Sequence, residues 1–135
     1  MHMLITEAHF GAGEALANRL ATAGVRVTRC HDEVGYCRAL APGGRCPLDA
    51  PTGDVDVVVD VRGPGAELTA REYGAVCAVR AGRPVLVVPD RLTATAVVPD
   101  ALRDVAHALT QDDLMERYAR TGVAHELGRP GAPSA

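Results

Sequence analysis

The stretch Val55–Val61 has the sequence VDVVVDV and is the clearest β-strand in the chain. β-Branched residues fit the pleated backbone of a strand. A nearly continuous apolar run is typical of a strand that is buried on both faces of a parallel sheet. Three more runs, Met3–Thr6, Val25–Arg29 and Pro84–Val88, predict further strands on either side of it.

The segments between these strands predict helices. Gly13–Ala23 carries Leu16 and Leu20 one turn apart, and Gly24 stands where a helix C-cap is expected. Leu68–Ala81 predicts a second helix between the third and fourth strands. Strands that alternate with helices form βαβ units, in which a parallel sheet is covered by helices on both faces.

The simplest arrangement of these elements is one flavodoxin-like α/β domain over residues 1–120, with strand order 2-1-3-4. The pattern weakens after the fourth strand. Thr93–Val98 could add a short fifth strand at the edge, and Asp100 could cap a helix with Leu102, Val105, Ala106 and Leu109 on one face. We expect a last short helix over 112–120 and a disordered tail over 121–135.

Composition narrows the class of protein. A chain of 135 residues with 47% hydrophobic content fits one domain, and a net charge of −3 gives no footprint for nucleic acid or an anionic membrane. No apolar stretch reaches the roughly 18 residues of a membrane span, and the N-terminal pattern leads us to expect no secretory signal. We expect a cytoplasmic protein whose partner is another protein or a second copy of itself. All 14 basic residues are Arg, which excludes a catalytic lysine.

The segment from Cys30 to Asp54 lies where a flavodoxin-like fold has its second helix. It is rich in Gly and Pro and has no sustained helical period, so we expect a long loop there. Its residues Cys30, His31, Cys37 and Cys46 have the spacing C-H-x5-C-x8-C. Thiolates and imidazole are ligands for zinc, and thiolates also hold iron–sulfur clusters.

A loop with little apolar content needs a crosslink to hold it, which favours a metal or cluster in this segment. A disulfide between Cys37 and Cys46 and three unlinked thiols are the alternatives. We interpret the fourth cysteine, Cys77, as a small buried hydrophobic residue, because it lies among Ala and Val in the second predicted helix.

Two carboxylates come at the ends of neighbouring predicted strands. Glu7 follows the first strand and Asp60 lies near the end of the third, so we expect them to meet in the crevice of a doubly wound sheet. Such a pair can hold Mg²⁺ or raise the pKa of one member. The alternative is that Asp60 pairs with Arg62 and Glu7 is solvated. His9 could add a base or a metal ligand.

The runs MLITEA, DVVVDVRGPG and RPVLVVP resemble the response-regulator receiver domain over roughly residues 3–90. The resemblance implies that Glu7 occupies one place of the family's acidic pair and that Asp60 occupies the phosphate-accepting place. Ala8 stands where the second acid would be, and the family's lysine is absent. The resemblance therefore implies a divergent, receiver-like module without efficient phosphate switching.

A second resemblance involves Thr6-x4-Gly11-x-Gly13, which is similar to the nucleotide loop of short-chain dehydrogenases. It implies that Gly11 and Gly13 let a pyrophosphate approach the helix N-terminus, and that Asp32 binds a ribose. Glu7 stands at the place of that loop's first glycine, and the family's Tyr-x3-Lys pair is absent.

The leading hypothesis is a non-enzymatic regulatory or binding module with receiver-like architecture. Its cysteine loop would bind zinc or an iron–sulfur cluster, or respond to redox state. The alternative is a small nucleotide- or flavin-binding protein, or an enzyme, that uses Glu7, His9, Gly11, Gly13 and Asp60, with Mg²⁺ or a nucleotide as its cofactor. A third possibility is a structural subunit that packs on another chain.

Overall fold

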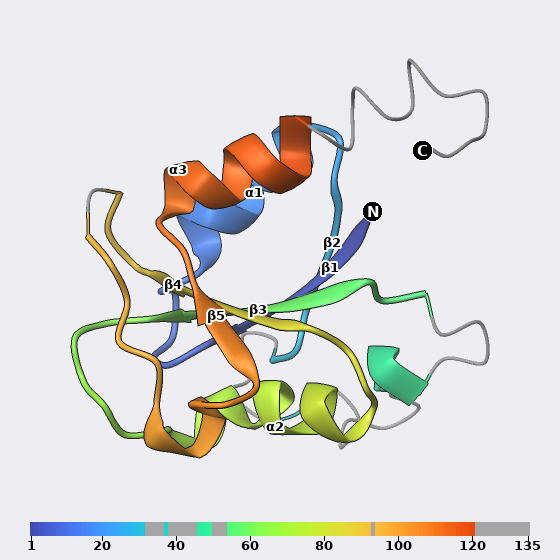
Figure 1. The fold of residues 1–135 in the computed structure, drawn as a ribbon. Helices are drawn as coiled ribbons and strands as arrows, with labels where there is room; N and C mark the ends of the chain where they lie inside the picture. The colour runs from blue at the N-terminus through green and yellow to red at the C-terminus, as the bar shows by residue number, and fades with distance from the viewer. Residues whose placement is uncertain (32–36, 38–45, 50–53, 93, 121–135) are drawn as a thin grey trace.

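The structure, a computed structural model, describes residues 1–31, 37, 46–49, 54–92 and 94–120. Its centre is a five-stranded parallel sheet with the order β2-β1-β3-β4-β5 (Figure 1). The strands are β1 (His2–Glu7), β2 (Arg26–Arg29), β3 (Val57–Arg62), β4 (Val85–Pro89) and β5 (Ala106–Ala108). The predicted flavodoxin-like α/β fold is confirmed.

Helices cover both faces of the sheet (Figure 1). One face carries α1 (Glu14–Thr22), α3 (Gln111–Leu114) and the wider π-helical segment η5 (Met115–Arg120). The other carries α2 (Tyr73–Arg80) and the short 3₁₀ turns η2 (Pro47–Asp49), η3 (Ala70–Glu72) and η4 (Asp100–Leu102). None of the helices in the described ranges is long and apolar enough to cross a membrane.

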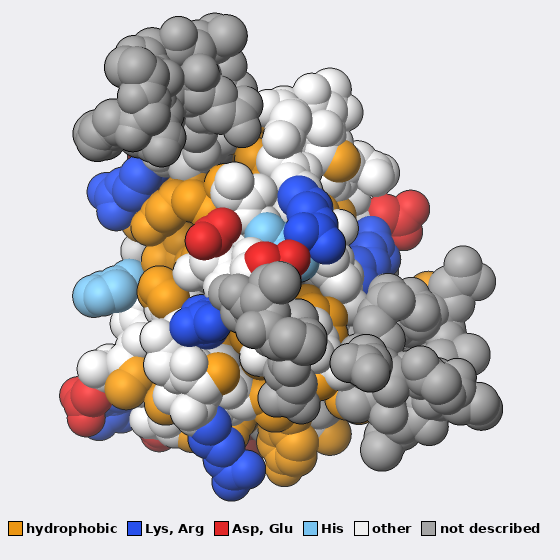
Figure 2. Space-filling model, turned by 90° about the vertical axis from the view of Figure 1, so that its right-hand side faces the viewer, with side chains coloured by type: hydrophobic (Ala, Val, Ile, Leu, Met, Phe, Trp, Pro, Cys, Tyr) orange, Lys and Arg blue, Asp and Glu red, His pale blue; other side chains and the backbone are white. Residues whose placement is uncertain are grey.

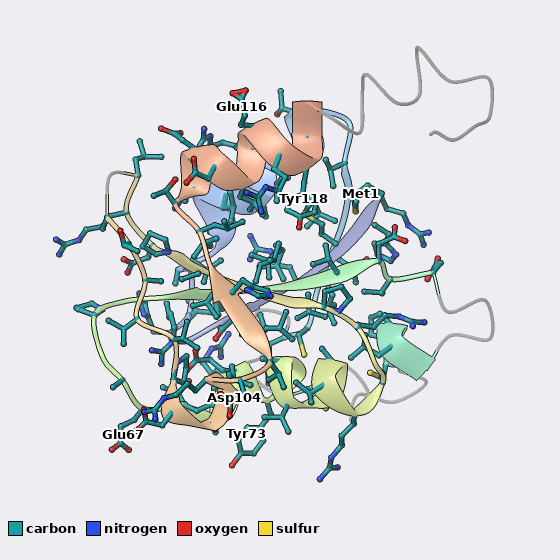
Figure 3. The ribbon with its side chains drawn as sticks, viewed as in Figure 1. Met1, Glu67, Tyr73, Asp104, Glu116 and Tyr118 are labelled. Carbon is teal, nitrogen blue, oxygen red and sulfur yellow. The ribbon has the colours of Figure 1, made fainter. Side chains whose placement is uncertain are left out.

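The core has two halves because successive strand residues point to opposite faces of the sheet. Ile5, Val59 and Val88 pack against the α1 side, whereas Leu4, Val58 and Val87 pack against the α2 side. Figure 3 shows that the helical segment η5 also has an inner and an outer side, with Tyr118 pointing toward the sheet and Glu116 pointing away from it. On the face seen in Figure 2, acidic and basic side chains are interspersed.

The region after β4 differs from the prediction. The expected helix at Asp100 is only the single turn η4, and Ala106 starts β5, which pairs with β4 at Val85. No strand forms over the described residues 94–98, so the fifth strand is Ala106–Ala108. Leu102 and Ala106 are buried, and their spacing of four suits a helix as well as this turn and strand. Hydrogen bonding to the edge of β4 favours the strand.

Other predicted elements are confirmed with small shifts. The helix expected at Leu68–Ala81 divides into η3 and α2, and the helix expected over 112–120 is α3 with η5. Between β2 and β3 the described residues form the turn η2 and an isolated bridge between His31 and Cys37. The rest of the predicted loop and the predicted tail (121–135) lie outside the described residues.

Gly74 lets the start of α2 approach the ends of β1 and β2. A Cβ atom on Gly74 would lie 2.8 Å from Cys30 Sγ and 3.2 Å from Thr6 Cβ. Both contacts are shorter than normal packing distances, so any side chain at this position would push α2 away from the sheet.

We expect Gly74→Ala to lower the free energy of unfolding by about 1 kcal/mol, because the cost of overpacking, about 1–3 kcal/mol, exceeds the gain of about 1 kcal/mol in helix propensity. Urea denaturation measures the change. Gly65→Ala is the matched control, since nothing lies within 4 Å of a Cβ there. A Gly74→Ala protein as stable as the wild type would contradict the close contact.

Candidate functional site

All four cysteines of the chain line one cavity, together with His31. The cavity has a volume of about 280 Å³ and lies on the α2 side of the sheet, between the end of β2 and the start of α2. Gly74 and Tyr73 of α2 also line it. Tyr73 itself extends outward from the helix, as Figure 3 shows. The structure therefore gathers Cys30, His31, Cys37 and Cys46 at one place.

Different elements supply the thiols. Cys30 follows β2 directly and is buried, and its backbone N–H donates to the carbonyl of Ile5 at 2.8 Å. Cys37 forms a backbone bridge with His31, and Cys46 precedes η2. Cys77 lies in α2. None of these cysteines is in a disulfide, so the predicted alternative of a Cys37–Cys46 disulfide is not formed in this structure.

The surroundings of His31 favour its neutral form. Burial, and then the positive charge of Arg71, lower the pKa of His31 below its usual range, although Glu7 acts in the opposite direction. Its Nδ1 atom is buried and has no hydrogen-bond partner within the described ranges. Neutral imidazole is the form that binds metals.

The residues that line the cavity suit a soft metal ion better than a hard one. Its described lining residues include thiols and an imidazole but no carboxylate, whereas Mg²⁺ and Ca²⁺ prefer oxygen ligands. Among the residues that the structure describes, no three His, Cys, Asp or Glu side chains are grouped closely enough to hold a single metal ion. The predicted metal ligands therefore share a cavity without forming a ready-made mononuclear site.

Neither a known family nor a curated protein matches this chain.

Glu7 has a structural role beside the cavity. Its carboxylate accepts hydrogen bonds from the backbone N–H groups of Gly11 and Gly13, both at 2.9 Å, and it pairs with Arg71 at 3.2 Å. A phosphate at this loop would have to displace the carboxylate, because the same N–H groups would bind it. Nucleotide binding at Gly11 and Gly13 stays a prediction.

The expected pairing of Glu7 with Asp60 is wrong. Asp60 is in register with Thr6, and Glu7 is in register with Val61. Because neighbouring residues of a strand point to opposite faces, Glu7 faces α1 whereas Asp60 faces α2. Asp60 is also fully buried, so it offers no exposed carboxyl group at the place that the receiver resemblance gives to the phosphate acceptor.

Asp60 belongs instead to a buried charge network with Arg62 and Glu72. The guanidinium group of Arg62 donates to both carboxylate oxygens of Glu72, at 2.7 and 3.1 Å, and to the backbone carbonyls of Gly65, Glu67 and Val97. Asp60 Oδ2 lies 3.8 Å from Arg62 Nε, too far for a hydrogen bond. The alternative prediction correctly places Asp60 beside Arg62, but its other part, a solvated Glu7, is wrong because Glu7 is buried.

The two carboxyl groups of this network, Asp60 and Glu72, differ in their pKa values. Burial, and then the neighbouring Glu72, raise the pKa of Asp60 to about 9, against the opposing effect of Arg62. Burial alone would also raise the pKa of Glu72, but hydrogen bonds, first of all from Arg62, lower it to about 2. At neutral pH, Glu72 is therefore the counterion of Arg62, and Asp60 is a neutral acid.

His9 lies apart from this network, in the part of the crevice where β4 ends. Its Nε2 atom is 3.6 Å from Asp90 Oδ2, and its side chain is more than half exposed. Gly63, just after β3, lies between these two residues, since its Cβ would be in contact range of both. His9 and Asp90 form a polar pair at the carboxyl edge of the sheet.

Sequence reasoning missed three residues of the site. Cys77 is exposed and lines the cavity, so its interpretation as a buried hydrophobic residue was wrong. Its position three residues after Gly74 would have indicated a shared helix face. Arg71 and Glu72 had no comparable signal, because their partners Glu7 and Arg62 are distant in sequence or belong to another element.

We expect Glu72→Ala to lower the free energy of unfolding by at least about 3 kcal/mol, because it leaves the buried Arg62 cation without its partner. The substitution also removes a capping box with Thr69. Asp112→Ala is the control: it removes an exposed partner of Arg19 and should cost less than about 1 kcal/mol. Equal losses in the two variants, measured by denaturation, would contradict this ranking.

Asp60 also predicts a pH dependence. Its pKa is raised in the folded state relative to about 3.9 in the unfolded chain, so folded protein binds the extra proton and stability falls as pH rises from about 4 to about 9. Asp60→Asn, which mimics the neutral acid, should remove most of this fall in unfolding free energy. The exposed control Asp104→Asn should retain it. A parallel pH profile for wild type and Asp60→Asn would contradict a neutral Asp60.

Proposed function

We propose that this chain is a non-enzymatic regulatory or binding module whose working site is the cysteine-lined cavity. In this proposal a zinc ion or an iron–sulfur cluster, bound through Cys30, His31, Cys37 and Cys46, organises the segment between β2 and β3. The state of that centre is then read by a protein partner or by a second copy of the chain.

The observation that carries the proposal is the gathering of all four cysteines and a histidine around a single cavity. These cysteines are separated by up to 47 positions in the sequence, from Cys30 to Cys77, and they come from a strand end, a helix and the connecting segment. Metal binding requires deprotonated thiols and neutral imidazole, so binding releases protons and stabilises the folded chain.

A route for signalling runs through Arg71. Arg71 lines the cavity, and its guanidinium group also holds the carboxylate of Glu7 and stacks over the exposed ring of Phe10 at 5.6 Å. Glu7 in turn caps the loop of Gly11 and Gly13 before α1. A change in cavity charge would therefore alter the loop that carries Phe10, an exposed aromatic side chain suited to a protein contact.

The test is metal and sulfide analysis of the full chain, purified without oxygen and without a histidine tag. We expect about one metal centre per chain, and we expect a chelator to lower the melting temperature, because a ligand bound only by the folded state stabilises it. The double variant Cys37→Ser, Cys46→Ser should lose both the metal and the response to chelator.

Tyr73→Phe is the matched control, since it changes a cavity-lining residue without removing a donor from the set. It should keep wild-type metal content. Wild-type protein that contains no metal after anaerobic purification, and whose melting temperature is the same with added zinc or with iron and sulfide, would overturn the proposed function.

A further inference from the structure

We propose that Cys77 takes the place of His31 as the fourth ligand of the site, and that Cys30, Cys37, Cys46 and Cys77 together hold an iron–sulfur cluster. This inference rests on the proposed function and deepens it in two ways. It names the chemical class of the bound group, and it assigns a ligand role to a residue in α2.

The position of Cys77 supports its role as a ligand. Gly74 and Cys77 are three residues apart in α2, which places them on one side of the helix, and both line the cavity. Cys30 Sγ lies so close to Gly74 that a methyl group there would overlap it. The helix thus offers bare backbone beside Cys30 and a thiol one turn further along the same wall.

The number of thiols around the cavity supports a cluster as the bound group. Zinc binds sulfur at about 2.3 Å, so tetrahedral geometry brings zinc-bound thiolates to roughly 3.8 Å from one another. No three donors among the described residues are grouped for one ion, although four thiols surround the same 280 Å³ of space. A cluster of several irons holds its four cysteines further apart, because each thiolate binds a different iron or shares one with a single neighbour.

The charges around the cavity suit such a group. Iron–sulfur clusters with four thiolates are anionic, and Arg71 supplies a guanidinium group at the cavity wall. Described lining residues include no carboxylate that would repel the cluster.

Two of the four cysteines lie in a regular element or directly after one, and two lie on the connection between β2 and β3. This arrangement suits the assembly of a cluster. Cys30 and Cys77 belong to the ordered scaffold, at the end of β2 and within α2, and they define one side of the site. Cys37 and Cys46 come from the connection between β2 and β3. A bound cluster would tie that connection to the sheet and to α2, and it would supply the crosslink that the segment's low apolar content calls for.

The experiment is anaerobic reconstitution of the full chain with ferrous iron and sulfide, followed by analysis of iron, acid-labile sulfide and visible absorption. We expect stoichiometric cluster in the wild type and a severalfold loss in Cys77→Ser. Cys77 is exposed, so serine should leave the packing intact, and hydrogen exchange of the amides of β1, β3 and β4 checks this. Tyr73→Phe, which changes a cavity-lining residue without removing a thiol or imidazole, should keep the cluster.

Two results would overturn the inference and leave the proposed function standing. One is zinc without sulfide, bound equally by wild type and Cys77→Ser. The other is a cluster that survives Cys77→Ser but is lost in His31→Gln, or whose reduced form has a hyperfine coupling to ¹⁵N-labelled histidine. The absence of any bound metal would overturn both proposals together.

Discussion

The buried pair of Arg62 and Glu72 is the constraint on which the rest of the site depends. Arg62 ends β3 with its guanidinium group inside the protein, and it joins the backbone at Gly65, Glu67 and Val97 to the carboxylate that precedes α2. These bonds fix where α2 begins relative to the sheet. Since Gly74 and Cys77 lie in the next turns, the same pair determines one wall of the cysteine-lined cavity. A buried ion pair is costly to form, so its value here lies in position more than in stability.

The turn η3, which follows Thr69, connects the Glu7 side of the crevice with the Asp60 side. The sequence predicts instead that these two carboxylates meet directly. Adjacent residues of η3 hold different partners: Arg71 binds Glu7 on the α1 side, and Glu72 binds Arg62 on the α2 side. The two strand-end carboxylates, Glu7 and Asp60, therefore never face each other, but both are connected to one short turn. Any group that moves η3 acts on the loop before α1 and on the cavity at once.

Sequence patterns with a local physical cause gave correct predictions, whereas features that depend on tertiary contacts were missed or misplaced. The apolar runs of β1, β3 and β4 and the Leu16–Leu20 spacing of α1 are local patterns, and they predicted the sheet order. β5 was missed because Ala106–Ala108 becomes a strand only by pairing with β4. The expected meeting of Glu7 and Asp60 was wrong because the register of β3 on β1 is a tertiary property. Of the cavity, the sequence predicted the segment of Cys30–Cys46 but not Cys77, which the fold brings from a separate helix.

A neutral Asp60 beside an ionised Glu72 means that folding at neutral pH takes up a proton. The unfolded chain holds this carboxyl group ionised, so unfolding releases the proton to the surrounding buffer. The heat absorbed in a calorimeter then contains the ionisation enthalpy of the buffer. Two buffers at the same pH would give different unfolding enthalpies for one transition, and the difference would count the protons that the buried network retains.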